Sequence, residues 1–183
     1  MYQTVPFGTK GRRNASFICY YAKDTTPYQG ASVEEGFPEG LDQIKAHKIL
    51  MQMRWDAKLG FTGGMVEEDE LRELMDANEL LMDAAVRESI EEIGYEPSPY
   101  HLVPLNSVVL HDKDLNVHLY MCERTEKELY DMQRNYQEGK HALIEGMGVL
   151  VMTLTDVCKK NLLTAQLAKG VREELEAIYE FLG

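Results

Sequence analysis

Arg87-Glu88-Ser89-Ile90-Glu91-Glu92-Ile93-Gly94 is the most informative stretch of this 183-residue chain. With about 100° per residue on a helix, Glu88, Glu91 and Glu92 fall on one face that spans roughly 100°. Like charges at i,i+4 repel each other by a few tenths of a kcal/mol, and the last turn of a helix disfavours anions. The acidic face is therefore costly without a compensating cation, and its hard oxygen atoms suit Mg²⁺ or Mn²⁺.

The residues around the acidic stretch predict a mixed sheet with helices packed against it, in a single domain over residues 1–183. A helix is expected over 67–93, in one or two pieces, with Gly94 as its C-cap. Residues 60–64 form a glycine-rich turn, and 23–40 a long surface loop. The remaining predicted elements are strands at 16–22, 47–53, 101–111 and 115–122, a buried strand at 146–154, and helices at 125–136 and 164–182.

Composition narrows the class of protein. Hydrophobic residues make up 44% and charged residues 27% of the chain, as in ordered globular domains. A net charge of −12 opposes binding to nucleic acid through a general basic surface, although metal ions can reverse the field locally. Residues 1–13 carry no apolar signal core and no stretch is long enough to span a bilayer, so an intracellular protein, cytoplasmic or nuclear, is expected. Three scattered cysteines, Cys19, Cys122 and Cys158, predict buried free thiols.

The acidic stretch belongs to a longer pattern. Glu79 is followed by seven residues and then by the 87–94 stretch, and Gly63-Gly64 lies upstream. This arrangement resembles the Nudix box, a glycine and a spaced glutamate followed by Arg-Glu-U-x-Glu-Glu-x-Gly-U, where U is aliphatic. An ordinary solvated acidic face would be the simpler interpretation of the glutamates alone, and this surrounding pattern argues against it.

The sequence departs from the box at several points. Ser89 and Tyr95 stand where aliphatic residues are usual, and Thr62 replaces the proline common before the double glycine. The gap between the glycines and Glu79 is longer than usual. Residues 67–78 fill it, and we expect them to form an extra surface helix whose thin apolar stripe (71, 74 and 75) caps the core or meets a partner subunit.

A second similarity identifies a branch of the superfamily. Residues 49–64, ILMQMRWDAKLGFTGG, look like the snoRNA-decapping, inosine-diphosphate-hydrolysing branch, and weaker similarity continues through 107–120, 145–154 and 171–175. The resemblance implies a Nudix α/β/α sandwich of the α/β class. It also implies a pyrophosphohydrolase that uses Mg²⁺ or Mn²⁺ to cleave a diphosphate bond in nucleoside diphosphate derivatives, with RNA 5′ caps or inosine diphosphate as candidate substrates.

The resemblance also implies roles for particular residues. Metal would be held by the backbone of Gly63, by Glu88, Glu91 and Glu92, and by His111 on the strand after the box. Arg87 would orient the glutamates. The general base would be Glu91 or Glu145, which precedes the last strand. A surface histidine, a loop carboxylate and an ordinary strand-edge charge are the alternatives for His111, Glu145 and Arg54.

Substrate contacts are expected from Arg54, which suits phosphate geometry, and from Phe61 near the base. Phe17 stands where the branch has a base-contacting histidine, and Glu174 where it has an amide. An aromatic ring stacks on a purine but does not discriminate it by hydrogen bonding. We therefore expect weak preference among purine bases.

Two competing functions remain at this point. The first keeps the chemistry but changes the substrate to a nucleotide sugar or a dinucleotide, because substrate choice lies outside the box. The second is a non-catalytic module that binds nucleotide or RNA, against which the intact glutamates argue. The expected partners are a nucleotide or capped RNA substrate and no membrane. A homodimer is left open.

Overall fold

The computed structural model describes residues 2–9, 11–24, 26, 46–67, 77–158 and 167–182. Strands and helices alternate irregularly along these segments. The strands are β1 (Tyr2–Val5), β2 (Arg13–Ala22), β3 (Lys48–Arg54), β4 (Leu59–Gly60), β5 (Thr62–Met65), β6 (Val103–Leu110), β7 (Leu115–Glu123) and β8 (Gly146–Thr153). The α-helices are α1 (Ala77–Ile93), α2 (Glu126–Asn135), α3 (Ala142–Glu145), α4 (Leu154–Cys158) and α5 (Val171–Leu182), with 3-10 turns at Pro99–His101 and Tyr136–Glu138.

The strands form one mixed sheet in the order β1-β6-β7-β2-β3-β4. Strand β5 pairs with β2 and β8 pairs with β3, both antiparallel. The parallel contact is between β2 and β7, which run side by side from Arg13↔Leu115 to Tyr21↔Glu123. This confirms the mixed sheet predicted from the sequence.

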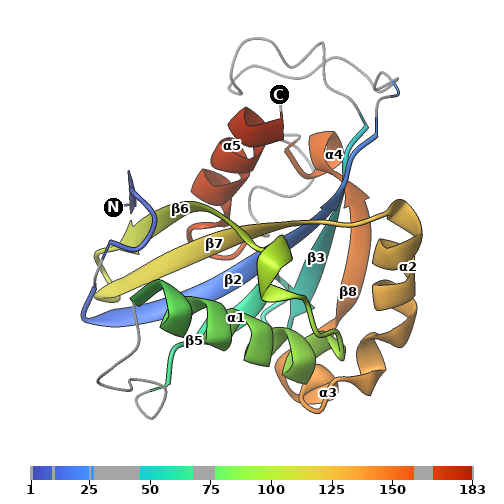
Figure 1. The fold of residues 1–183 in the computed structure, drawn as a ribbon, viewed down its shortest axis with the longest axis horizontal. Helices are drawn as coiled ribbons and strands as arrows, with labels where there is room; N and C mark the ends of the chain where they lie inside the picture. The colour runs from blue at the N-terminus through green and yellow to red at the C-terminus, as the bar shows by residue number, and fades with distance from the viewer. Residues whose placement is uncertain are drawn as a thin grey trace.

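Helices cover both faces of the sheet, so the fold is an α/β/α sandwich, as predicted (Figure 1). Side chains alternate across β2 because successive residues of a strand point to opposite faces. Cys19 and Tyr21 pack in a buried cluster with the α5 residues Leu175 and Ile178. Ile18 and Tyr20 belong to a second cluster on the other face, with residues of α1 and α2.

Helix α1 carries the acidic stretch in its last two turns. It ends at Ile93, and Gly94 follows with φ of +67°, the left-handed conformation of a helix C-cap, as predicted. Glu67 lies outside any helix, so the predicted helix begins later than expected. Residues 68–76, which hold most of the predicted extra surface helix, lie outside the described residues.

Several other predictions are confirmed at the level of elements. Strands β6 and β7 pair antiparallel around a turn at residues 111–114. Thr125 begins α2 with a reciprocal capping box to Glu128, because its hydroxyl accepts the backbone N–H of Glu128 and the glutamate accepts the N–H of Thr125. Cys19 and Cys122 are buried free thiols, whereas the side chain of Cys158 lies outside the described residues.

Two predictions about the C-terminal part were wrong in detail. Strand β8 is only partly buried, because its described pairing is with β3 alone and Gly146 and Val149 are its buried positions. The last helix begins at Val171, not at 164: Leu167 bridges to Leu59, and Gly170 adopts φ of +91° immediately before the helix. Residues 164–166 lie outside the described residues. In the described part of the chain, no helix has the length and apolar character needed to cross a bilayer.

Candidate active site

A cleft of about 1030 Å³ opens between the glycine pair of β5, the acidic end of α1 and the start of α5. Its walls come from β2, β3, the β4–β5 segment, α1, the β6–β7 turn, α3 and α5. Segments far apart in the sequence therefore meet here. The lining residues that bear on function are Arg13, Phe17, Gln52, Arg54, Trp55, Lys58, Phe61, Gly63, Gly64, Glu88, Glu92, Lys113, Ile144, Lys169 and Glu174.

The glycine pair allows close backbone approach on two sides. Gly63 has φ of +147°, and a Cβ at this position would lie 2.2 Å from the carbonyl oxygen of Ser16 on β2. A Cβ on Gly64 would lie 2.3 Å from Oε1 of Glu88. Larger residues at either position would push β5 away from β2 or from α1. Residues 60–64, predicted as a glycine-rich turn, lie mostly in β4 and β5 instead, and the double glycine brings β5 and the acidic helix together.

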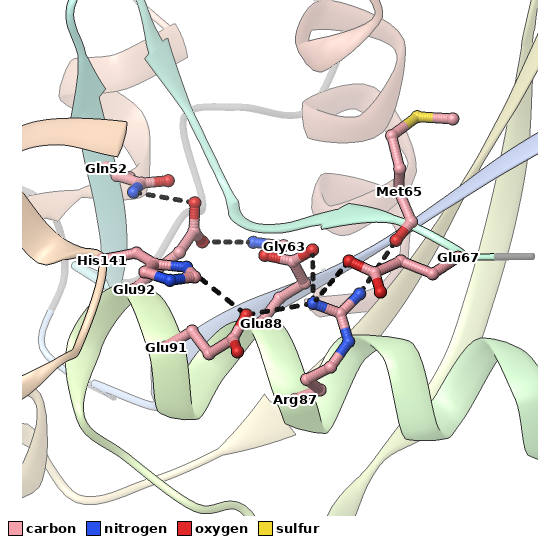
Figure 2. A network of polar contacts seen from close by, with 9 residues as sticks. All are labelled: Gln52, Gly63, Met65, Glu67, Arg87, Glu88, Glu91, Glu92 and His141. Atoms are coloured by element: carbon pink, nitrogen blue, oxygen red, sulfur yellow. Dashed lines mark hydrogen bonds and ion pairs between the residues drawn. The ribbon is translucent and has the colours of Figure 1, made fainter. Parts of the chain in front are cut away.

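Glu92 is held by hydrogen bonds from two separate strands. Its Oε2 accepts the backbone N–H of Gly63 at 2.7 Å, and its Oε1 accepts the side-chain amide of Gln52 at 3.0 Å (Figure 2). Glu92 is 4% exposed and Glu88 is 8% exposed. Two nearly buried carboxylates therefore form part of the cleft wall beside the glycine pair.

Arg87 contacts the other two glutamates. Its Nη1 lies 3.1 Å from Oε1 of Glu88 and donates to Oε2 of Glu91 at 3.1 Å, while Nη2 donates to the carbonyl oxygen of Met65 at 3.0 Å (Figure 2). One guanidinium thus ties the helix to β5 and fixes two carboxylates. Arg87 was predicted to orient the glutamates, and these contacts are the ones that such a role requires.

The loop after α2 closes over the end of the acidic helix. His141 donates its backbone N–H to the carbonyl oxygen of Glu91 at 2.7 Å, and its ring Nδ1 lies 3.5 Å from Oε2 of the same residue (Figure 2). Gly139 packs so closely that an added Cβ would lie 2.7 Å from that carbonyl. The loop therefore satisfies a helix-end carbonyl and adds a second contact to the Glu91 side chain.

The carboxylates point in two directions, which bears on metal binding. Glu88 and Glu92 line the cleft, whereas Glu91 turns toward Arg87 and His141. Within the described residues, no three histidine, cysteine, aspartate or glutamate side chains converge as a metal cage. Glu88 and Glu92 nevertheless present hard oxygen donors in a polar cleft, the donor type that Mg²⁺ and Mn²⁺ accept with water and substrate oxygens completing the shell. The residues of the cleft therefore fit such an ion as a partial site.

The three predicted substrate residues lie in the same cleft. Phe17 on β2 and Phe61 between β4 and β5 form part of its apolar wall, with Phe61 buried and Phe17 partly buried. Arg54, at the end of β3, is half-exposed, and its Nε lies 3.7 Å from Oδ1 of Asp56. The structure thus brings together two aromatic rings and a guanidinium from three separate segments.

Other predicted residues lie apart from the cleft wall. His111 is exposed in the turn after β6 and does not belong to the cleft lining, and Arg87 and Glu91 line a separate, smaller pocket beside α1. The side chain of Glu145 lies outside the described residues. Sequence reasoning missed Gln52 and His141. Gln52 stands two residues before Arg54 on the same strand, so strand alternation places both side chains on one face. This spacing was the signal that could have added Gln52 to the predicted site.

Glu174 is the least expected side chain in the cleft. It is 3% exposed, and its Oε1 has no hydrogen-bond partner within the described residues. Burial, with a smaller contribution from Glu173, raises the pKa of Glu174 to about 8. The carboxyl group is therefore largely neutral at pH 7. In this form it resembles the neutral amide that stands at this position in the Nudix branch named in the sequence analysis.

The departures from the box compensate one another. Ser89 is fully buried, and its hydroxyl donates to the carbonyl oxygen of Tyr95 at 2.7 Å. The hydroxyl of Tyr20 on β2 lies 2.6 Å from Ser89 Oγ, and the rings of Tyr20 and Tyr95 meet edge to face at 5.5 Å. A polar pair thus replaces two aliphatic contacts between α1 and the sheet without leaving these hydroxyls unsatisfied.

The fold and the acidic cleft define a protein of the Nudix fold. Solved structures share this fold. One is a MutT/Nudix family protein from Listeria innocua, with a TM-score of 0.55 and 15% identity over 94% of this chain and 95% of that chain. Another is the Nudix domain of Shewanella oneidensis NrtR complexed with ADP ribose, with a TM-score of 0.56 and 16% identity over 95% of this chain and 90% of that chain.

The family follows from closer comparisons. Residues 41–170 match the family described as Nudt16-like, U8 snoRNA-decapping enzyme-like, so the chain belongs to the Nudt16-like family. A curated relative, the U8 snoRNA-decapping enzyme of Homalodisca vitripennis, is 35% identical over 109 residues, which are 58% of this chain and 54% of that protein. The chain thus matches about half the length of that relative.

Proposed function

We propose that this chain is a divalent-metal-dependent pyrophosphohydrolase that cleaves a diphosphate bond in nucleoside diphosphate derivatives. The observation that carries the proposal is the pair of nearly buried carboxylates, Glu88 and Glu92, beside Gly63 and Gly64 in a cleft with aromatic and guanidinium groups. Membership of a family described by a decapping enzyme supports the same chemistry and makes capped RNA the first candidate substrate.

The metal would be Mg²⁺ or Mn²⁺, held by Glu88, Glu92 and the backbone of Gly63. When bound, it would neutralise charge on the phosphates and lower the pKa of water. Glu92 already accepts hydrogen bonds from Gly63 and Gln52, which fix its carboxylate in place before any ligand arrives. Such preorganisation lowers the cost of assembling the site.

The proton of the attacking water needs an acceptor. Glu91 is our first candidate, because Arg87 and His141 hold its carboxylate in a defined position. Glu145 is the second, by its position before β8. Arg87 would act as a positioning residue, since it contacts Glu88, Glu91 and the Met65 carbonyl, and also Glu67 at 3.8 Å.

Arg54 would hold a phosphate, and Phe17 or Phe61 would stack on the base. A guanidinium suits phosphate oxygens, and stacking accepts every base because each has a π face. This arrangement predicts broad base tolerance. Hydrolysis of nucleotide sugars or dinucleotides is the alternative within the same chemistry. A role as a non-catalytic nucleotide- or RNA-binding module is the alternative of another class.

A substrate panel tests the proposal. With Mn²⁺ present, we expect hydrolysis of at least one of capped RNA, inosine diphosphate, a dinucleotide or a nucleotide sugar, with phosphate-ended products identified by chromatography. Excess chelator should abolish turnover, and restored Mn²⁺ should recover it. Turnover that persists in chelator would contradict metal dependence. Saturable binding without turnover of any substrate would favour the non-catalytic module.

Variants in the cleft test the division of roles. Arg54→Ala is expected to lower kcat/KM for most substrates alike, by about 10- to 100-fold, because a charge-assisted hydrogen bond to phosphate is lost. Phe17→Ala should chiefly raise KM, by about tenfold, through lost stacking. Arg12→Ala, an exposed charge outside the cleft, is the control. A hundredfold preference of the wild type for inosine over adenosine diphosphate would contradict broad tolerance.

A further inference from the structure

Trp55 is the sole tryptophan of the chain and is 58% exposed. Its ring is nevertheless held in place, because Nε1 donates to the carbonyl oxygen of Ile144 on α3 at 2.7 Å. Ile144 is itself 70% exposed. A large aromatic ring left in water but fixed by a hydrogen bond is a preformed surface for a planar ligand.

The turn that carries Trp55 is tightly bonded. The backbone N–H of Arg54 donates to the carbonyl of Lys58 at 2.9 Å, and that of Ala57 donates to the carbonyl of Arg54 at 3.0 Å. Ala57 adopts φ of +59°, which closes the turn between β3 and β4. The backbone under the indole is therefore defined, and the ring is presented in one orientation by two independent anchors.

Trp55 and Ile144 line the same cleft as the box carboxylates, at the side of α3. The side of α5 holds Glu174, and Phe17 packs against the core beneath that helix. The cleft is thus lined by residues of both α3 and α5, two helices that lie well apart in Figure 1. The carboxylates of Glu88 and Glu92, on α1, line the same cleft. A ligand that fills the cleft would therefore meet two aromatic surfaces, at Trp55 and at Phe17, besides the carboxylates.

The charge near Trp55 suits a phosphate-bearing ligand. Arg54 and Lys58 flank it, and their contacts with Asp56, at 3.7 and 4.0 Å, are loose surface pairs. Within a chain of net charge −12, the cleft collects basic side chains. Those in its lining are Arg13, Arg54, Lys58, Lys113 and Lys169, alongside the acidic Asp56, Glu88, Glu92 and Glu174.

We propose that the indole of Trp55 stacks on the base of a second nucleoside, joined through the diphosphate to the nucleoside that Phe17 and Phe61 hold. The inference rests on the proposed function and narrows its substrate class to compounds with a nucleoside on each side of the cleaved bridge. A dinucleoside polyphosphate and the capped 5′ end of an RNA share this chemistry. Arg54 and Lys58 would face the phosphates of the bridge.

The emission of the single tryptophan gives a direct test. Wild-type protein is mixed in a stopped-flow instrument with a dinucleoside triphosphate, a capped oligonucleotide or the matching nucleoside diphosphate, and fluorescence is recorded before turnover. Stacking of a base on the indole quenches emission. We expect saturable quenching by both two-nucleoside ligands and several-fold less by the nucleoside diphosphate. Quenching by the capped oligonucleotide alone would assign the site to RNA within the same proposal.

Kinetics provide the second arm. The ratio of kcat/KM for the dinucleoside triphosphate to that for the nucleoside diphosphate should fall about 10- to 100-fold in Trp55→Ala, because a stacked base contributes about that much to binding. Trp55→Phe should restore most of the ratio, since a phenyl ring still stacks. Tyr100→Ala removes another aromatic ring, 96% exposed and outside the cleft lining, and should leave the ratio unchanged.

The outcomes separate the two proposals. Equal quenching by all ligands, or an unchanged ratio in Trp55→Ala, would overturn the second-nucleoside subsite while leaving hydrolysis intact. Loss of self-association in Trp55→Ala, measured by analytical ultracentrifugation, together with an unchanged kcat/KM ratio would also overturn the subsite. The indole would then serve a protein interface. If no substrate is hydrolysed, the proposed function fails, and selective quenching alone still decides the subsite.

Discussion

Replacing Glu92 with glutamine is expected to lower kcat/KM by at least about 100-fold on the best substrate of the panel. Oxygens of this carboxylate accept the Gly63 N–H and the Gln52 amide, and we propose the group as a metal ligand. A glutamine keeps the shape but loses the charge that a divalent ion requires. Because Gln52 can rotate its amide to present its oxygen, the variant retains both hydrogen bonds, and the melting temperature should change little.

The comparison needs a matched carboxylate outside the cleft. Glu96→Gln removes an exposed glutamate just beyond the same helix and should leave both kcat/KM and the melting temperature unchanged. Glu91→Gln is expected to match Glu92→Gln in its loss of rate, through either a metal or a base role. Wild-type turnover in both variants would mean that the acidic face is merely solvated.

Glu174→Gln is expected to stabilise the protein at pH 8 by about 4 kcal/mol, with little effect near pH 4.5. The wild-type side chain is buried in the cleft wall and its Oε1 lacks a hydrogen-bond partner among the described residues, so its ionised form is disfavoured. Glutamine has nearly the same shape and remains neutral at every pH. Chemical unfolding of both proteins across the pH range measures the difference.

The direction of this pH dependence follows from how many protons the folded and unfolded states bind. Burial raises the pKa of Glu174 from 4.5 in the unfolded chain to about 8 in the folded protein. Between these values the folded state holds a proton that the unfolded state has released, so the free energy of unfolding falls as pH rises, until the folded group also ionises near pH 8. Glu180→Gln, on an exposed position of α5, should show no such trend. A difference between Glu174→Gln and wild type that stays constant with pH would contradict the buried neutral carboxyl.

The local parts of this architecture could be predicted from the sequence. The acidic helix and its glycine cap each carry a signal within a few residues, and so does the glycine pair, although it lies in β5 and not in the predicted turn. The hairpin of β6 and β7 and the helix that begins after Thr125 are equally local. The fold class also followed from the box resemblance. These features depend on backbone preferences and short-range hydrogen bonds, which a linear pattern records.

The parts that could not be predicted depend on distant segments. Nothing near His141 in the sequence indicates that its loop closes on the end of α1, and nothing near Trp55 indicates the Ile144 carbonyl. The apolar run of β8 predicted a buried strand, although its place beside β3 leaves it half-covered. Burial depends on which elements pack on a strand, and one sequence does not contain that information.

The parallel pairing of β2 with β7 also bears on how the cleft comes into being. These strands join residues 102 positions apart along the chain, as Tyr21 and Glu123 show. Closing so large a loop costs conformational entropy before the contacts form, and chains dominated by distant pairings fold slowly. Phe17 lies on β2, and Glu174 follows β7 in the sequence. The complete cleft therefore requires β2, β7 and α5 to come together, so its formation depends on the slow, long-range pairing of the sheet.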